Sequence, residues 1–269
     1  MSAPVSPLSQ ARSFLFVPGH RPERLAKALA SGADAVIVDL EDAVPLDAKD
    51  AARAALVAGW SALDDAQRAR LLVRVNPAGT PWHAADLAAV AGLSGLGAVM
   101  LPKAENVQQI EAVALASQRP VLPLVESAEG VGQMDAMARA SGVLRLGLGH
   151  IDLQADLGMH CGPDETELAP IRVALVVASR RAGLPAPVDG VTTATTDEEV
   201  LARDAQRSRR FGFGAKLCIH PAQVAGVHQA LAPTEAECAW AERVLAAEVE
   251  ARGGAFSVDG KMVDPPGAA

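Results

Sequence analysis

Tyrosine is absent from this chain of 269 residues, and aromatic residues make up only 3% of it. The core must therefore be built chiefly from Ala, Leu and Val, and hydrophobic residues at 50% suffice for one large core or two small domains. Cysteine is also scarce, with Cys161, Cys218 and Cys238 and no CxxC pair. This number and spacing argue against a disulfide framework or a structural zinc site. We expect a reduced, cytoplasmic protein.

The sequence has no basic run that could follow a phosphate backbone. Its 32 acidic residues outnumber the 24 basic ones, for a formal charge of -8, so nucleic acid is not an expected partner. The longest uncharged stretch, 87–102, is shorter than the ~20 apolar residues of a membrane helix, and we expect no membrane partner. Residues 1–10 have neither a basic start nor an apolar run, so no export signal is visible.

Short apolar runs alternate eight times with longer segments of helical period. The strand-like runs are Ser13–Val17, Ala35–Leu40, Leu71–Val75, Ala98–Leu101, Val121–Val125, Val143–Leu148, Ala186–Gly190 and Ala215–Ile219. The helix-like segments are Arg21–Ala30, Asp47–Leu63, Pro81–Leu93, Asn106–Ser117, Glu129–Ala140, Ala169–Ala182, Asp197–Phe211 and Pro221–Ala230. The strands are apolar on both faces, as in a parallel sheet covered by helices. The pattern favours an α/β fold, a closed (β/α)8 TIM barrel over residues 1–232, rather than a doubly wound sheet.

Residues 233–269 are extra to this barrel. They contain a helix-like stretch over 234–252, a Gly pair, and a weak alternation around Asp259 and Gly260 that predicts a short hairpin. A frayed terminus is the alternative. The apolar side chains of the predicted hairpin favour a lid-like tail that docks on another surface.

Polar residues stand directly after the apolar strands. They are Pro18-Gly19-His20, Asp39-Leu40-Glu41-Asp42, Arg74-Val75-Asn76-Pro77, Pro102-Lys103, Glu126-Ser127, Gly149-His150-Ile151-Asp152 and His220-Pro221. Any one of these charges alone could be solvated or could belong to a salt bridge. An Arg, a Lys and several acids at the C-terminal ends of barrel strands together favour an active site.

Glu126 and Asp152 follow neighbouring strands. Two carboxylates with room for water and substrate are a usual arrangement for Mg2+. The alternative is a buried ion-pair network in which Arg74 or Lys103 neutralises the two acids.

Other motifs are weaker. Gly147-Leu148-Gly149 lacks the third Gly of a dinucleotide fingerprint and is expected to precede Asp152 rather than an open helix N-terminus. His150, His160 and Cys161 could be drawn as a zinc site, but their spacing is unspecific.

Several motifs together carry a family resemblance. They are Phe14-Leu15-Phe16-Val17-Pro18-Gly19, Arg21-Pro22-Glu23-Arg24, Asp39-Leu40-Glu41-Asp42, Arg74-Val75-Asn76, Leu101-Pro102-Lys103, Val125-Glu126-Ser127 and Cys218-Ile219-His220-Pro221. In this order they resemble the citrate lyase β-subunit-like group of the HpcH/HpaI aldolase superfamily. The resemblance implies a TIM barrel, a Mg2+ ion with Mn2+ as the alternative, and reversible cleavage of a 3-hydroxyacyl thioester to an acyl-CoA and a 2-oxo acid. It also implies a homotrimer or hexamer in which a C-terminal segment covers the neighbour's active site.

The resemblance also implies roles for individual residues. Glu126 and Asp152 match the metal ligands, Arg74 the substrate-contacting Arg, and Glu41 and Asp42 the acids that orient metal-bound water and Arg74. Asp264 matches an acid/base carried by the lid of an adjacent subunit. By looser analogy Arg24 and Lys27 contact the CoA phosphates, and Lys103 is assigned to the substrate. The sequence departs from many relatives at Gly149-His150-Ile151-Asp152, where they have Gly-Ala-Glu-Asp, and it ends five residues after Asp264.

Three functions remain open from the sequence. The first is a Mg2+-dependent CoA-ester lyase acting on a substrate such as malyl-CoA or citramalyl-CoA. The second is a malyl-CoA-type thioesterase, or a citrate lyase β subunit acting on a thioester bound to an acyl carrier protein. The third is a binding or scaffold subunit without activity, which the intact acids and Arg74 make the least favoured. The acyl group has no readable signature in the sequence.

Overall fold

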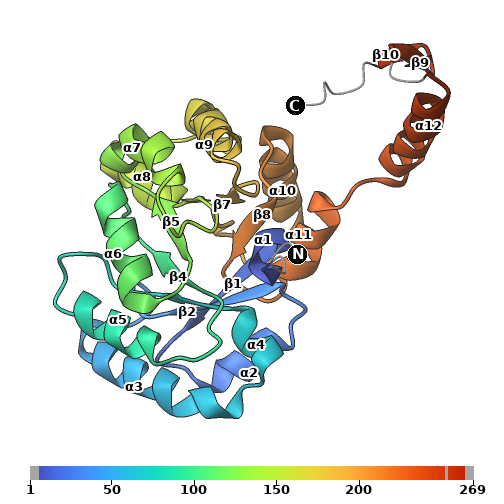
Figure 1. Ribbon diagram of the computed structural model, residues 1–269. Helices are drawn as coiled ribbons and strands as arrows, with labels where there is room; N and C mark the ends of the chain where they lie inside the picture. Colours follow the sequence, from blue (N-terminus) through green and yellow to red (C-terminus); the bar gives the residue numbers. More distant parts are fainter. Residues whose placement is uncertain (1–5, 252–253, 264–269) are drawn as a thin grey trace. The chain divides into compact units, whose positions relative to one another are not determined.

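The computed structural model describes residues 6–251 and 254–263, and its centre is a closed barrel of parallel strands in the order β1 to β8 (Figure 1). The strands are β1 Ser13–Pro18, β2 Ala35–Asp39, β3 Leu71–Arg74, β4 Ala98–Leu101, β5 Val121–Val125, β6 Gly147–Leu148, β7 Val188–Asp189 and β8 Ala215–Cys218. Pairing of β8 with β1 closes the barrel, through Ser13 and Lys216 among others. The predicted (β/α)8 TIM barrel is confirmed.

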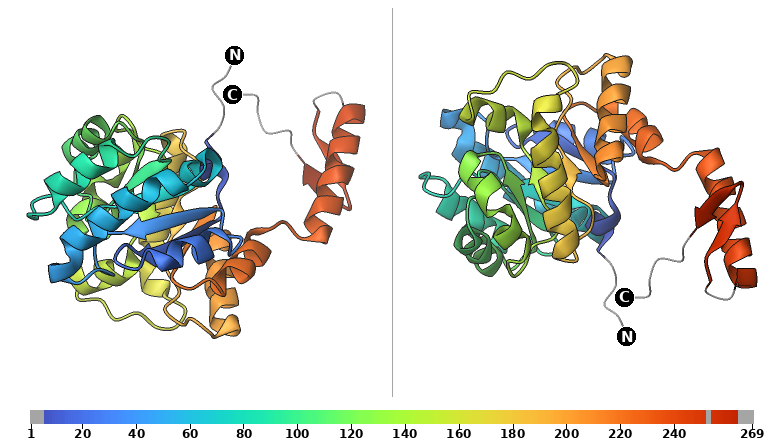
Figure 2. Two further views of the ribbon diagram at one scale, coloured as in Figure 1. Left: turned by 90° about the horizontal axis from the view of Figure 1, so that it is seen from below. Right: turned by 90° about the horizontal axis from the view of Figure 1, so that it is seen from above.

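Helices surround the strands on the outside of the barrel (Figure 2). They are α1 Pro7–Gln10, α2 Glu23–Leu29, α3 Lys49–Gly59, α4 Asp65–Ala69, α5 His83–Ala91, α6 Val107–Ser117, α7 Ala128–Ala138, α8 His150–Asp156, α9 Ala169–Arg181, α10 Glu198–Phe211 and α11 Gln223–Leu231. Side-chain caps begin several of them: Asn106 accepts the Gln109 N–H at 2.9 Å, and Ser127 accepts the Gly130 N–H at 3.1 Å.

Alternate residues of each strand enter two different apolar cores. Phe14, Ile37 and Met100 belong to a cluster inside the barrel, whereas Leu15 and Val36 belong to the larger cluster shared with the helices. Because the strands are buried on both faces, their sequences are mostly apolar, with the buried Asp189 of β7 and Lys216 of β8 among the exceptions. This explains why the strands were readable as short uninterrupted runs.

Some predicted elements differ from the structure. The strand expected over 143–148 is reduced to β6, and Val143 makes only an isolated bridge to Val121. The helix expected over 47–63 is α3 flanked by two short 3-10 turns. The short helix α8 was not expected: Gly149 is its N-cap, so the interpretation that no helix begins after Gly147-Leu148-Gly149 was wrong.

The chain divides into two compact units, Met1–Leu231 and Ala232–Ala269. The second contains α12 Glu235–Ala251 and a hairpin of β9 Phe256–Val258 and β10 Lys261–Val263, which pair antiparallel as predicted. Asp259 and Gly260 turn the hairpin with φ of 51° and 75°. Arg243 of α12 binds Asp259 at 2.7 Å.

Two apolar residues of the hairpin differ in solvent exposure. Val258 is buried, whereas Met262 is 77% exposed. Asp264 lies outside the described residues. Among the described residues, no helix combines the length and apolar character that crossing a bilayer takes.

Candidate active site

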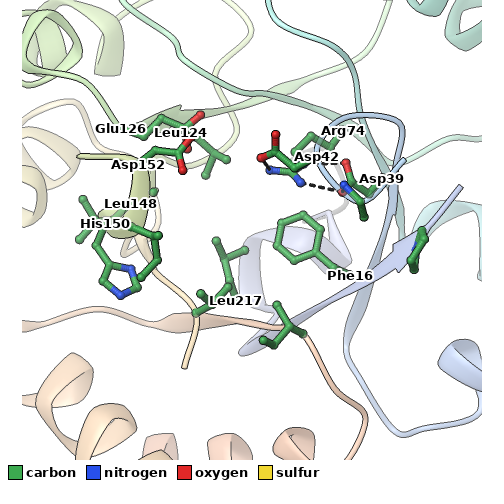
Figure 3. Close-up of a pocket in the computed structure, with 16 residues that line it drawn as sticks. Phe16, Asp39, Asp42, Arg74, Leu124, Glu126, Leu148, His150, Asp152 and Leu217 are labelled. Atoms are coloured by element: carbon green, nitrogen blue, oxygen red, sulfur yellow. Dashed lines mark hydrogen bonds and ion pairs between the residues drawn. The ribbon is translucent and has the colours of Figure 1, made fainter. Parts of the chain in front are cut away.

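A pocket of about 390 Å³ opens among residues at and just beyond the C-terminal ends of the barrel strands (Figure 3). Its lining contains Asp39, Asp42, Arg74, Glu126 and Asp152 together with apolar side chains. These charged residues come from four strands or the loops after them, and parallel strands bring their carboxyl ends to one face. The predicted Arg74, Asp42, Glu126 and Asp152 therefore share one cavity.

Arg74 is the last residue of β3, and Asp39 is the last residue of β2. The strand register places them side by side. Arg74 Nε and Nη2 donate to the two carboxylate oxygens of Asp39 at 2.7 and 2.6 Å, a two-bond clamp that fixes the plane of the guanidinium. Only 11% of the Arg74 side chain is exposed, and burial opposes its charge, but the hydrogen bonds and charge of Asp39 raise its pKa further above the ordinary value.

Glu41 and Asp42 also approach Arg74. Arg74 Nη1 lies 2.8 Å from Glu41 Oε2 and 3.5 Å from Asp42 Oδ2. The contact with Glu41 is an ion pair without a hydrogen bond, and Glu41 Oε2 has no hydrogen-bond partner. Burial raises the pKa of Glu41 to about 8, and Arg74 offsets only part of this effect.

The backbone of the acid loop, residues 40–43, is held by hydrogen bonds with the side chains of Asp39 and Lys49. Asp39 accepts the N–H groups of Glu41 and Ala43 at 2.9 and 3.1 Å. The buried Lys49 donates its ammonium to the carbonyls of Leu40 and Glu41 at 2.9 and 2.7 Å. Sequence reasoning assigned no role to Asp39 or Lys49. The sequence did contain a signal for Asp39, because this carboxylate is the last residue of an otherwise apolar strand.

Glu126 follows β5 and is almost completely buried. Its Oε1 accepts the backbone N–H of Lys103 at 2.7 Å, and Lys103 takes the left-handed backbone conformation with φ of 48°. A Cβ atom on Gly149 would lie 2.1 Å from Glu126 Oε2, so the carboxylate occupies space that is open only because residue 149 has no side chain. Burial raises the pKa of Glu126 to about 7, and the charge of Asp152 adds to the shift.

Asp152 stands in the first turn of α8, with 40% of its side chain exposed. Figure 3 shows it beside Glu126 at one side of the pocket. Its Oδ2 lies 3.4 Å from the ammonium of Lys103, which also lies 3.9 Å from Glu41 Oε1. Burial lowers the pKa of Lys103, but the charges of Glu41 and Asp152 outweigh it and raise the pKa, so the ammonium stays protonated.

The donor set fits a hard divalent cation. Within the described residues, no group of three or more His, Cys, Asp or Glu side chains is arranged to hold a metal. Mg2+ needs fewer protein ligands, since it usually keeps several waters and takes one or two carboxylates plus substrate oxygens. Glu126 and Asp152 provide two carboxylates whose mutual repulsion a cation would relieve. The predicted alternative is present in part, because Lys103 pairs with Asp152, while the acids paired with Arg74 are Asp39, Glu41 and Asp42.

His150 is buried, lines the pocket and approaches Glu165 in the segment before α9. Its Nε2 lies 3.5 Å from Glu165 Oε1, and a Cβ on Gly190 would lie 2.0 Å from its Nδ1. Burial lowers its pKa, so the ring is neutral. The sketched zinc site of His150, His160 and Cys161 does not form among the described residues.

Arg24 and Lys27 lie outside this pocket. Both are exposed on α2, three residues apart and therefore on one face of the helix. Neither lines the cavity that holds Arg74.

The fold and this arrangement of acids can be compared with known proteins. The chain matches the family described as HpcH/HpaI aldolase/citrate lyase over residues 12–221, and it belongs to this family. The expected family resemblance is thus confirmed.

Individual relatives agree with this assignment. The chain is 39% identical to a citrate lyase subunit beta-like protein of Deinococcus radiodurans, over 99% of this chain and 95% of that protein. It is 38% identical to a (3S)-malyl-CoA thioesterase of Cereibacter sphaeroides, over 94% of this chain and 89% of the relative. It also resembles the crystal structure of protein CitE from Mycobacterium tuberculosis in complex with magnesium, acetoacetate and coenzyme A, with a TM-score of 0.85, 39% identity, and coverage of 96% and 94%.

Proposed function

We propose that this chain is a Mg2+-dependent carbon–carbon lyase. Its substrate is a 3-hydroxyacyl-CoA such as malyl-CoA or citramalyl-CoA, which it cleaves to, or forms from, an acyl-CoA and a 2-oxo acid. The observation that carries the proposal is one pocket that contains both the Glu126 and Asp152 carboxylates and the clamped guanidinium of Arg74.

Glu126 and Asp152 are the proposed metal ligands, with Mn2+ as the alternative ion. When bound there, Mg2+ would supply positive charge that polarises the carbonyl of the 2-oxo acid. The lyase family is consistent with this, since the similar CitE structure contains magnesium. Lys103 is protonated beside Asp152 and is therefore a poor amine nucleophile.

Arg74 is the proposed oxyanion donor. Carbon–carbon cleavage leaves an enolate, and catalysis requires hydrogen-bond donors where its negative charge develops. Asp39 occupies Nε and Nη2 of Arg74, so the guanidinium is held in one orientation before substrate arrives. Its Nη1 is paired with Glu41 and Asp42, and this is the edge that would exchange one of these acids for the reacting oxygen.

Proton transfer completes the proposed reaction. In the cleavage direction the hydroxyl proton leaves to a carboxylate of the acid loop, Glu41 or Asp42. Asp264, protonated beforehand, then donates its own proton to the enolate carbon, and both acids recover their starting protonation states by exchange with water. We propose that Asp264 comes from an adjacent subunit of a homotrimer or hexamer, with residues 233–269 acting as the lid.

Coenzyme A is the proposed thiol carrier. Arg24 and Lys27 present two cations on one face of α2, suited to phosphates, and Lys103 contacts the substrate at the pocket. The similar CitE structure contains coenzyme A, which supports this choice over an acyl carrier protein.

The product mixture tests the proposal. Purified protein with Mg2+ and malyl-CoA or citramalyl-CoA should release a 2-oxo acid in step with acyl-CoA, and no free thiol. A thioesterase is the second candidate, favoured by the 38% identity to a (3S)-malyl-CoA thioesterase. Release of free CoA together with the intact hydroxy acid would support that candidate and refute the lyase. A Glu126→Gln variant serves as the inactive control in both assays.

A further inference from the structure

Helix α8 carries Asp152 but is too short to hold its own orientation. It has seven residues, and its N-cap is a glycine, which makes no side-chain hydrogen bond. Two of its residues are buried: Leu153 enters the apolar core, whereas His150 contacts polar groups. Asp156 fixes the far end of α8 by accepting the N–H of Ala128 at 2.7 Å. The first turn, where Asp152 stands, therefore depends on what His150 contacts.

One edge of the His150 ring packs on the backbone of Gly190. A Cβ atom on Gly190 would lie 2.0 Å from Nδ1 and 2.8 Å from Cε1 of the ring, so ring and backbone are in direct contact. The N–H of Gly190 donates to Asp189 at 2.9 Å, and its carbonyl accepts the ammonium of Lys216 at 2.7 Å. Asp189 and Lys216 are both buried. The backbone that supports the ring is thus itself held by two buried charges.

The other nitrogen of the ring faces Glu165. Nε2 of His150 lies 3.5 Å from Glu165 Oε1, while Oε2 is occupied by the guanidinium groups of Arg172 and Arg207. Burial lowers the pKa of the imidazole, so it is neutral, and we assign its proton to Nε2, where the N–H dipole points toward the carboxylate. Figure 3 shows the ring directed away from the carboxylate of Asp152.

We propose that His150 is a positioning residue that sets the place of Asp152 at the metal site. The inference rests on the proposed function, because it takes Asp152 as a metal ligand. The ring, held between the Gly190 backbone and the Glu165 carboxylate, fixes the first turn of α8, and Asp152 lies in that same turn. The carboxylate is then oriented before Mg2+ arrives, which lowers the cost of assembling the site. His150 acts through Asp152 and exchanges no proton with the substrate.

Calorimetric Mg2+ titration of a matched pair of variants tests this inference. Methionine and glutamine have side chains of nearly the same length, but glutamine alone keeps an N–H donor at about the reach of Nε2. His150→Met should raise the Mg2+ dissociation constant about tenfold, whereas His150→Gln should bind Mg2+ nearly as the wild type does. A merely structural His150 would lower the free energy of unfolding in urea with EDTA and leave Mg2+ affinity unchanged. Equal Mg2+ affinities of the two folded variants would overturn the inference.

Glu165→Gln provides the second arm, because it leaves the ring in place and removes the charge that the ring faces. Its Mg2+ dissociation constant should rise, and the double variant with His150→Met should bind no more weakly than His150→Met alone, since both changes remove one contact. Losses that add would show that the two residues act independently and would overturn the inference. If His150→Met does not fold, Glu165→Gln decides: wild-type affinity in that variant also overturns it.

Asp152→Asn separates this inference from the proposed function. That variant should weaken Mg2+ binding at least about tenfold, because one of two carboxylate ligands is lost. If it does so while His150→Met binds Mg2+ as the wild type does, the metal site stands and the positioning role of His150 is wrong. If Asp152→Asn binds Mg2+ with unchanged affinity, the proposed metal site is wrong, and this inference fails with it.

Discussion

Replacing Gly149 by alanine should displace Glu126 and weaken the proposed metal site. The new Cβ would lie 2.1 Å from Glu126 Oε2 and 2.5 Å from Glu126 Cβ, far inside van der Waals contact. The backbone at Gly149 has φ of -97° and ψ of 67°, close to the inverse γ-turn conformation, which is open to alanine, so the contact dominates the effect. The carboxylate must therefore retreat by about 1 Å, in a pocket where Lys103 N–H currently holds its other oxygen.

A displacement of this size is large for a Mg2+ ligand, because Mg2+ demands near-octahedral geometry at about 2.0–2.1 Å. We expect the Mg2+ dissociation constant to rise roughly 10- to 100-fold, equivalent to about 1.4–2.8 kcal/mol. Overpacking should cost a further ~1–3 kcal/mol of unfolding free energy. Calorimetric Mg2+ titration measures the first quantity, and urea unfolding with EDTA present measures the second.

Gly132→Ala is the matched control. Gly132 lies within α7, and a Cβ there would meet nothing within 4 Å. That variant should be more stable by ~0.5–1 kcal/mol and bind Mg2+ as the wild type does. If a folded Gly149→Ala protein also binds Mg2+ with unchanged affinity, Glu126 does not hold the metal.

Three other predictions concern catalysis, stability and assembly. Lysine in Arg74→Lys cannot reproduce the two-bond clamp on Asp39, so kcat should fall roughly 10²- to 10³-fold in steady-state kinetics with little change in KM. A raised KM with unchanged kcat would show that Arg74 contributes to substrate binding alone. Burial alone would raise the pKa of Asp189, but Lys216 and Arg172 outweigh it and hold the pKa below 3.8. Its stabilising contribution is therefore complete above pH 3.8 and is lost as pH falls through the lower pKa of the folded state. In urea unfolding from pH 2 to 7, Asp189→Asn should be less stable by about 3–5 kcal/mol at neutral pH, and its unfolding free energy should fall less steeply as pH is lowered. An unchanged dependence of the unfolding free energy on acid pH would contradict this. Asp264→Asn and Glu126→Gln, each inactive alone, should recover part of the activity when their subunits are mixed and exchanged; mixed oligomers without activity would exclude an Asp264 shared between subunits.

The barrel could be predicted from the sequence because its strands are buried on both faces. The uninterrupted runs at Ala98–Leu101 and Val121–Val125 match β4 and β5 residue for residue. Prediction was poorer at β6, where the apolar run 143–148 reads as one strand but only Gly147 and Leu148 pair in the ladder. Pairing depends on the neighbouring strands, and an apolar run alone does not contain that information.

The charged residues of the pocket could be predicted because they directly follow apolar strands of the barrel. The residues that hold them in place could not be predicted as well. Asp39 clamps Arg74 through the register of β2 against β3, and Lys49 supports the acid loop by binding carbonyl groups, which no residue type announces. Helix α8 was missed because it begins directly after β6, with Gly149 as an N-cap that makes no side-chain hydrogen bond.

A crystal grown with Mn2+ and pyruvate tests the central claim most directly, because manganese is visible by anomalous scattering and prefers the same oxygen ligands. The account predicts one anomalous peak bound by the carboxylates of Glu126 and Asp152, with pyruvate oxygens completing its coordination. No peak at these carboxylates, with the ammonium of Lys103 still paired to Asp152, would contradict the metal site and the lyase mechanism built on it.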